Sequence, residues 1–226
     1  MILLCGGTKG GCGKSLLAVN VAAALAHQGV DVLLIDGDEQ GSSATFAQIR
    51  ADLTLPGGTF TTIQLHGPAI RQQMPVLREK YQEIVIDVGG RDTGSLRAAL
   101  TVADAILAPF QPRSVDIWSA VQLAALISEA RTVNESLRAY AVINAADAQG
   151  KDNDEAAAAL RSLDGIEALP GVIVRRKAFP NAFTVGLSVL EQHPQDHKAV
   201  DELLYVVHTL YPQRRHTNDR EARKAG

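Results

Sequence analysis

Short apolar runs alternate with longer, helix-like stretches along most of this chain. Apolar runs of four to six residues are typical of strands buried on both faces, and the longer stretches are typical of helices. The pattern predicts strands at about Ile2–Cys5, Val32–Asp36, Ile84–Val88, Ala105–Pro109, Ala139–Ile143 and Val172–Val174, with Thr59–Leu65 as a short edge strand. It predicts helices at about Lys14–Gln28, Ser43–Ala51, Ala69–Tyr81, Ser95–Val102, Ser114–Arg131, Asn153–Leu163 and His197–Tyr211.

This alternation predicts an α/β fold with a mostly parallel central sheet that helices cover on both faces. The 226 residues fit a single domain. We expect residues 1–212 to form that domain and residues 213–226 to be a polar, mobile tail. Apolar residues make up 46% of the chain and aromatic residues only 4%, so the core should consist of Ala, Val, Leu and Ile.

Charge and cysteine content narrow the functional classes. A formal net charge of −3 argues against a protein that coats nucleic acid with its whole surface, but it leaves a local basic patch open. Cys5 and Cys12 form no Cys-x-x-Cys pair, so neither a disulfide framework nor a zinc site is expected, and a cytoplasmic location is the natural interpretation. No apolar stretch approaches the length of a membrane span, so we expect no stable membrane association.

The strongest chemical signal is the glycine-rich run from Lys9 to Ser15, which lies between the first predicted strand and the first predicted helix. This strand, loop and helix context predicts a phosphate-binding loop of the P-loop type. Backbone N–H groups of such a loop converge on phosphate oxygens, and the helix N-terminus adds partial positive charge. We expect Lys14 to reach the β- and γ-phosphates and Ser15 to hold Mg²⁺. The phosphate-binding residues would be Gly10, Gly11, Cys12, Gly13, Lys14 and Ser15.

Acidic side chains follow two of the predicted strands: Asp36 and Asp38 follow the second, and Asp87 closes the third. Ligands of open parallel sheets gather at the carboxyl ends of strands, so these carboxylates should converge on the phosphate loop. Asp36 and Asp87 are predicted to lie near the hydration shell of the metal. A turn cap at the strand end is the alternative role for Asp36.

Lys9 distinguishes this loop from the ordinary phosphate-loop pattern, which has a glycine where this chain has Thr8. Lys9, two glycines and then Gly13-Lys14-Ser15 resemble the deviant Walker A motif of the ParA/MinD family of ATPases. The segment 32–40 resembles the family's Asp-x-Asp-x-Gln segment, and 172–191 resembles its C-terminal signature, so the resemblance covers nearly the whole chain. The resemblance implies a P-loop NTPase fold with ATP and Mg²⁺ as cofactors.

The resemblance also implies roles for individual residues. Lys9 would reach across a homodimer interface to the partner's nucleotide, and Asp38 would position or deprotonate the attacking water. Lys9, Lys14 and Asp38 are therefore the predicted catalytic residues. The chain departs from the family at Glu39, where proline is usual, and at the Gly-Gly-Arg-Asp run 89–92, where Asp-Thr-Pro-Pro is more common around Asp87. Arg91 in this run could sense the γ-phosphate, support the dimer, or be a solvated loop residue.

Two further regions carry weaker predictions. Asn144, at the end of a strand, could pair with the N6/N7 edge of adenine; the resemblance favours ATP, while the spacing of Asn144 and Asp147 alone leaves GTP open. The densest basic cluster, Arg175, Arg176 and Lys177, could contact DNA phosphates together with basic residues of the tail at 214–224. An ordinary solvated basic turn is the alternative.

The leading functional hypothesis is therefore a DNA-partition ATPase whose ATP-bound homodimer binds DNA without sequence preference. By resemblance, a DNA-bound ParB-like protein would stimulate hydrolysis and release it, and the protein would be cytoplasmic and nucleoid-associated in its ATP state. A related ATPase that positions another cargo (a conjugation complex, a carboxysome or a division protein) is the main alternative. A MinD-like membrane switch and a dethiobiotin-synthetase-like enzyme are less favoured, the latter because of Lys9.

Overall fold

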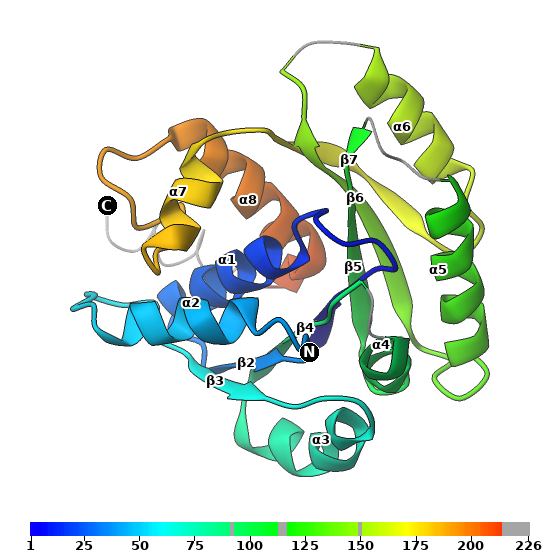
Figure 1. Cartoon of the computed structure of the whole chain (residues 1–226), viewed down its shortest axis with the longest axis horizontal. Helices are drawn as coiled ribbons and strands as arrows, with labels where there is room; N and C mark the ends of the chain where they lie inside the picture. Colours follow the sequence, from blue (N-terminus) through cyan, green and yellow to red (C-terminus); the bar gives the residue numbers. More distant parts are fainter. Residues whose placement is uncertain (91–92, 113–116, 149–150, 214–226) are drawn as a thin grey trace.

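The computed structural model describes residues 1–90, 93–112, 117–148 and 151–213 and shows one sheet flanked by helices (Figure 1). The strands are β1 (Ile2–Cys5), β2 (Val32–Asp36), β3 (Thr61–Gln64), β4 (Glu83–Asp87), β5 (Ala105–Phe110), β6 (Arg138–Ala146) and β7 (Glu167–Val174). The helices are α1 (Lys14–His27), α2 (Ser42–Ala51), α3 (Pro68–Lys80), α4 (Thr93–Leu100), α5 (Ile117–Ala130), α6 (Asp152–Arg161), α7 (Ala178–Thr184) and α8 (His197–Leu210).

The strands form a seven-stranded sheet in the order β3-β2-β4-β1-β5-β6-β7, and the neighbouring strands are parallel. β1 lies at the centre, so the loop that follows it begins at the middle of the sheet's carboxyl edge. The register places Asp36 of β2 beside Asp87 of β4, and Asp87 beside Cys5 of β1. The predicted acidic residues therefore meet at one edge, as the sequence indicated.

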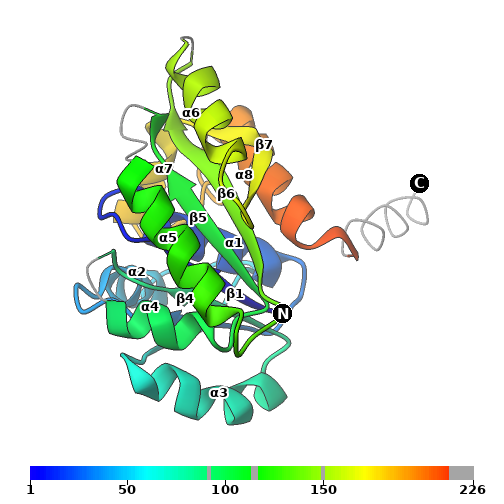
Figure 2. The ribbon, with the colours of Figure 1, turned by 90° about the vertical axis from the view of Figure 1, so that its right-hand side faces the viewer.

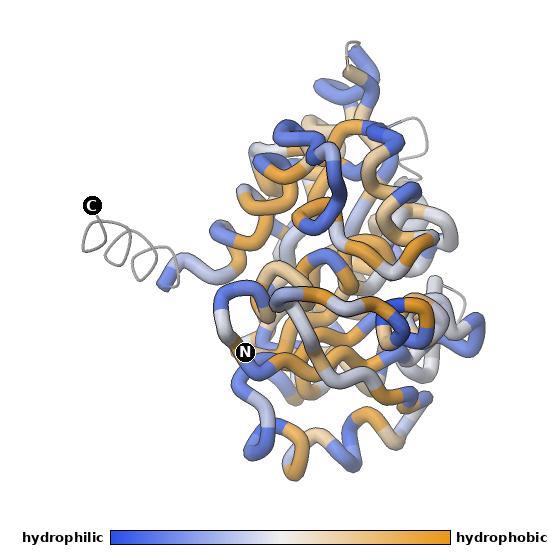
Figure 3. The backbone as a smooth tube through the Cα atoms, turned by 90° about the vertical axis from the view of Figure 1, so that its left-hand side faces the viewer, coloured by the Kyte–Doolittle hydropathy of each residue, from blue (hydrophilic) through white to orange (hydrophobic). Residues whose placement is uncertain are grey.

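Alternate side chains of the strands pack into two separate hydrophobic cores, one on each face of the sheet. Leu3 and Leu34 face a core formed with α1, α2, α7 and α8, whereas Leu4 and Leu33 face a core formed with α3 to α6. Figure 2 shows α3, α4, α5 and α6 together on one face. Hydrophobic residues concentrate in the interior of the fold, and hydrophilic residues lie at its outer turns (Figure 3). The predicted α/β architecture is confirmed.

The last strand and one helix differ from the prediction. β7 was expected only over 172–174, but it begins at Glu167 and contains Pro170 and Gly171. Proline is tolerated in an edge strand because its missing N–H can face away from the ladder, so the usual breaker signal misled the sequence interpretation. α7 was not predicted: it has seven residues with Pro180 in its first turn, and two of them, Phe179 and Ala182, are buried.

The first turn of α5 carries an exposed tryptophan and lies beside the glycine-rich loop. Trp118, near the start of α5, is 82% exposed and so is not a core residue. The neighbouring Ser119 carbonyl accepts a hydrogen bond from Thr8 Oγ1 at 2.9 Å, which places this end of α5 beside the glycine-rich loop.

None of the described helices is long and apolar enough to cross a membrane. The predicted tail lies, apart from Gln213, outside the described residues.

Candidate functional site

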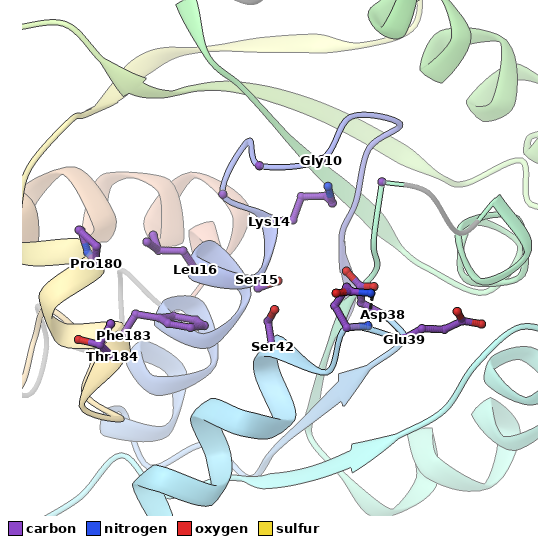
Figure 4. Close-up of a pocket in the computed structure, with 14 residues that line it drawn as sticks. Gly10, Lys14, Ser15, Leu16, Asp38, Glu39, Ser42, Pro180, Phe183 and Thr184 are labelled. Carbon is purple, nitrogen blue, oxygen red and sulfur yellow. Dashed lines mark hydrogen bonds between the residues drawn. The ribbon is translucent and has the colours of Figure 1, made fainter.

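A cavity of about 1050 Å³ opens where the glycine-rich loop, α2 and α7 meet (Figure 4). Loop and α1 residues line its centre, and Asp38, Glu39 and Gln40 line one end. Leu16, Pro180, Phe183 and Thr184 line the other end, which is more apolar. A molecule with an anionic part and a flat apolar part would match the loop at the centre and the apolar end of this cavity.

The glycine-rich loop has the backbone geometry of an anion site. Gly11 (φ 74°) and Gly13 (φ 98°) adopt left-handed conformations, which L side chains rarely tolerate. Gly13 directly precedes α1, and no side chain caps that helix end. The first N–H groups of α1 therefore lack an intrahelical acceptor at the wall of the cavity, where they can donate to phosphate oxygens.

Lys14 lies at the centre of this site, and its ammonium group contacts the backbone of the glycine-rich loop. Its side chain is 6% exposed, and its Nζ donates to the Lys9 carbonyl oxygen at 2.6 Å. Cys12 Sγ lies 3.7 Å from the same ammonium. Figure 4 shows the Lys14 side chain beneath the loop that carries Gly10. The ammonium is thus held at the site, with the loop's own carbonyl as its acceptor.

Asp87 supplies a buried carboxylate that can still accept a further ligand. Its Oδ2 accepts a hydrogen bond from Ser43 Oγ at 2.7 Å, while Oδ1 is buried and has no hydrogen-bond partner among the described residues. Burial raises the pKa of this carboxyl from 3.8 to about 6, and the nearby Asp36 adds to the rise. The hydroxyls of Ser15 and Ser43 and the Lys14 ammonium act in the opposite direction. An unpartnered buried carboxylate oxygen beside Ser15 fits a hydrated Mg²⁺, a hard cation that prefers oxygen ligands.

Asp36 and Asp38 have different roles in this conformation. Asp36 is fully buried, its Oδ1 accepts from the Asp38 N–H at 3.1 Å, and its Oδ2 accepts from the Ala44 N–H at 2.7 Å. Burial is the main cause that raises the pKa of Asp36. Because both of its carboxylate oxygens accept hydrogen bonds from backbone N–H groups, Asp36 stabilises the conformation of the β2–α2 loop. Its predicted place near the metal stays a prediction.

Asp38 is half-buried and reaches the cavity. Its Oδ1 accepts from the Gln40 N–H at 3.0 Å, and its carboxylate lies directly against Gly89 in the loop after β4. The carboxylate thus sits between the β2–α2 loop and the β4–α4 loop. Asp38 lies at the acidic end of the cavity, and its predicted water-positioning role stays a prediction.

Asn144 is placed against the glycine-rich loop. Its Nδ2 donates to the Cys12 carbonyl oxygen at 2.7 Å, and the side chain is 6% exposed. A methyl group on Gly13 would collide with this amide. Asn144 therefore supports the loop in this structure, and reading an adenine edge would require the amide to turn away. The adenine contact stays a prediction.

The predicted basic cluster divides into exposed and paired members. Arg176 binds Glu202 of α8, with Nη2 to Oε1 at 2.7 Å, and this contact is the main cause that raises its pKa. Arg175 and Lys177 are exposed. The cluster is therefore not a uniform basic surface, since one of its three charges is compensated within the fold. Arg91, also a candidate, lies outside the described residues, as do the basic residues of the tail.

Sequence reasoning missed residues that organise the cavity walls. Arg50 of α2 is 7% exposed and binds Glu191 through both carboxylate oxygens, at 2.6 and 2.8 Å. It also donates to the carbonyl oxygens of Gly186 and Gly58, at 2.9 and 2.7 Å. These contacts fix α2 to the loop that follows α7. A single arginine in a predicted helix gives no sequence signal for such a position.

Asn20 of α1 adds a second attachment for the same loop. Its Oδ1 accepts from Ser188 Oγ at 2.9 Å and from the Val189 N–H at 3.0 Å. Residues 186–191, which carried part of the sequence resemblance, are therefore an anchor that holds the end of α7 to α1 and α2. This explains physically why that run needs a serine and a glutamate.

A parallel sheet with a glycine-rich loop after its central strand, a helix N-terminus, a buried lysine and a strand-end carboxylate defines a P-loop nucleotide-binding protein. The model of the CobQ/CobB/MinD/ParA nucleotide binding domain matches residues 3–189, and the chain belongs to that family. Among curated proteins, the chain is 34% identical to the maintenance of carboxysome distribution protein A of Gloeobacter kilaueensis over 189 residues, 81% of each chain.

Protein ParA of Rhizobium radiobacter is 25% identical over 187 residues, which cover 82% of this chain and 83% of ParA. Among solved structures, a Cyanothece McdA variant in complex with ATP superposes with a TM-score of 0.73. That match covers 92% of this chain and 95% of the McdA chain at 17% identity, so it supports the fold alone.

Proposed function

We propose that this protein is an ATPase that positions or partitions a cargo on DNA, and that its ATP-bound form is a homodimer. The observation that carries the proposal is that Lys14, Ser15 and Asp38 line one cavity at the end of a glycine-rich loop, with the buried carboxylate of Asp87 beside Ser15 and Lys14. The relatives named above include both a carboxysome distribution protein and a ParA protein, and both kinds are similar to this chain over most of its length.

The residues around the cavity suggest how they would act on ATP. The free N–H groups at the start of α1 and the Lys14 ammonium would bind the phosphates, and Leu16 with Phe183 would border the nucleoside. Mg²⁺, held through Ser15 and Asp87, would neutralise phosphate charge. Asp38 would orient a water molecule for in-line attack on the γ-phosphate; a single positioned carboxylate is enough because phosphoryl transfer depends mainly on positioning and charge neutralisation.

Lys9 is the residue proposed to link nucleotide to dimer formation. It is half-buried, and its carbonyl holds Lys14 in the conformation described above. In a face-to-face dimer its ammonium would contact the partner's triphosphate, so dimerisation would require the γ-phosphate. Light scattering should show a dimer with ATP and a monomer with ADP. Lys9→Gln should remain monomeric with ATP, whereas Lys80→Gln, an exposed lysine on α3, should behave as wild type.

DNA binding without sequence preference is proposed for the ATP-bound dimer. An electrophoretic mobility shift should appear with ATP and be weak with ADP or no nucleotide; equal shifts in all three conditions would contradict an ATP switch. A DNA-bound partner that stimulates hydrolysis is expected for a partition protein.

Cargo positioning at a carboxysome or a similar assembly is the second candidate, favoured by the similarity to the Gloeobacter protein. An Asp38→Ala variant held in its ATP state should capture the partner from the native host. The proteins recovered would distinguish a DNA-bound partner from a cargo-bound one.

A further inference from the structure

The buried carboxylate of Asp87 lies between the first turns of two helices. Asp87 ends β4 on the same face as Val85, two residues earlier, whose side chain packs in the core formed with α1 and α2. The hydroxyl groups of Ser15, in α1, and Ser43, in α2, both interact with its carboxyl group. Figure 4 shows the starts of these two helices at one cavity, which Ser15 and Ser42 line. Two helices therefore begin beside one carboxylate.

The backbone of Asp87 is fixed by strand pairing on both sides. Its register partners are Cys5 of β1 and Asp36 of β2. Its carbonyl oxygen also accepts a hydrogen bond from the Gly37 N–H at 2.8 Å. These backbone contacts leave the side-chain torsions of Asp87 undetermined, so the direction of the carboxylate depends on side-chain partners.

Ser43 is a partner that can set this direction. Its Oγ donates to Asp87 Oδ2 at 2.7 Å, and the serine is fully buried. The hydroxyl is the donor because an ionised carboxylate can only accept hydrogen bonds. Ser43 is itself held in place, since the N–H of the next residue, Ala44, donates to Asp36 Oδ2 at 2.7 Å. Adjacent residues of α2 thus attach its first turn to the carboxyl ends of β2 and β4.

The bond from Ser43 leaves the other carboxylate oxygen of Asp87 available. Oδ1 is buried and has no hydrogen-bond partner within the described ranges. Rotation of the carboxyl group would exchange the two oxygens or turn them away from Ser15, and it would break the bond to Ser43. Groups that orient a metal-binding side chain in this way typically contribute about 10- to 100-fold to metal affinity.

We propose that Ser43 is a positioning residue for Mg²⁺: its hydroxyl orients the Asp87 carboxylate so that Oδ1 stays available to the hydration shell of the metal. The inference rests on the proposed function in one respect, that the cavity binds a nucleotide together with Mg²⁺. Ser42 is among the described residues that line the cavity, and Ser43 is not. Ser43 therefore acts on the metal through Asp87 and does not act on the nucleotide directly.

Ser43→Ala tests this role because it removes the hydroxyl and retains the buried methylene. Binding of a fluorescent ATP analogue is measured at a series of Mg²⁺ concentrations and in EDTA. We expect the Mg²⁺ concentration for half-maximal enhancement of binding to rise about tenfold, the lower end of the range for such contacts. The affinity in EDTA should equal that of wild type, because the glycine-rich loop and Lys14 are unchanged.

Ser95→Ala is the matched control. Ser95 of α4 is also fully buried, and its Oγ accepts a hydrogen bond from the Gly67 N–H at 2.8 Å. Both variants should lower the melting temperature without nucleotide, because each leaves a buried polar group with one partner fewer. Only Ser43→Ala should change the Mg²⁺ half-point. A similar change in both variants would overturn the inference, since any buried serine would then have this effect.

The remaining outcomes separate the inference from the proposed function. Wild-type protein that binds no nucleotide would refute the proposed function. Wild-type binding with the same Mg²⁺ half-point in Ser43→Ala would overturn the role of Ser43 alone. Weaker binding of the variant in EDTA would also overturn it, because the hydroxyl would then support the site as a whole.

Ser43→Cys provides the test if the alanine variant does not fold. A thiol is a weaker donor than a hydroxyl, so the Mg²⁺ half-point should again rise while the affinity in EDTA stays as in wild type. An unchanged half-point in this variant would contradict the positioning role.

Discussion

Two arginine–glutamate pairs in this chain have the same contact distance and opposite surroundings. Arg50–Glu191 and Arg97–Glu129 each have a shortest contact of 2.6 Å. Arg50 and Glu191 are 7% and 5% exposed, whereas Arg97 and Glu129 are 52% and 63% exposed. Breaking a buried pair by removing one partner leaves an uncompensated charge, but an exposed pair is screened by water. The chain therefore contains its own control for the effect of burial.

We predict that Arg50→Met destabilises the protein by about 3–5 kcal/mol, the cost typical of breaking a buried pair. The methionine retains apolar volume near the rings of Phe46 and Phe60, so the loss reports the guanidinium and not a cavity. Within the described part of the chain, Glu191 would keep only its contacts with His27 and the Ser188 N–H. For a chain of this size, 1 kcal/mol corresponds to roughly 2–4 °C, so the melting temperature should fall by about 6–20 °C.

The control, Arg97→Met, should cost about 0–1 kcal/mol. Urea unfolding followed by circular dichroism measures both variants against wild type in the absence of nucleotide. Comparable losses from the two arginines would refute the argument that burial decides the contribution. A double variant, Arg50→Met with Glu191→Leu, should recover part of the stability, since no buried charge is left unpaired.

Three further predictions concern the cavity and the basic cluster. Asp87→Asn should remove a pH dependence: between pH 4 and 6 the folded chain holds a proton at Asp87 that the unfolded chain has released. Wild-type stability should therefore fall by up to roughly 3 kcal/mol as the pH rises through that window, measured by urea unfolding without Mg²⁺; an identical slope in the variant would contradict this. Gly13→Ala should abolish ATP-analogue binding, because its φ of 98° is strained for alanine and the methyl meets Asn144. Arg175→Ala with Lys177→Ala should reduce the salt dependence of DNA binding by about 0.9 per lost phosphate contact; an unchanged slope would place the DNA surface elsewhere.

Local pattern was sufficient for the central part of the fold. β1 and β2 match the predicted ranges because buried parallel strands are short apolar runs with clear ends, and the motif residues of the phosphate loop lie between them. α7 and the first half of β7 could not be found in this way. Their sequences contain Pro180 and Pro170, and their stability comes from contacts with α1, α2, β6 and α8 that no local pattern encodes.

The site shows the same division. The identity and convergence of Lys14, Asp38 and Asp87 follow from motif and topology, because parallel strands place their carboxyl ends at one edge. The hydrogen-bond partners of those side chains could not be predicted from the sequence. The bonds from Lys14 to the Lys9 carbonyl and from the Ser43 hydroxyl to Asp87 join segments whose relative position is set only by the fold. Sequence identifies the chemical groups, and packing determines their acceptors and donors.

Trp118 gives this protein an optical property of practical value. It is the chain's single tryptophan, its indole ring is largely surrounded by solvent, and it adjoins the end of α5 that is tied to Thr8. Any surface that comes to cover this point, whether a second copy or another protein, will move the indole from water into a less polar medium. Intrinsic emission will then shift to shorter wavelength, so assembly around the glycine-rich loop can be followed in real time without an attached dye.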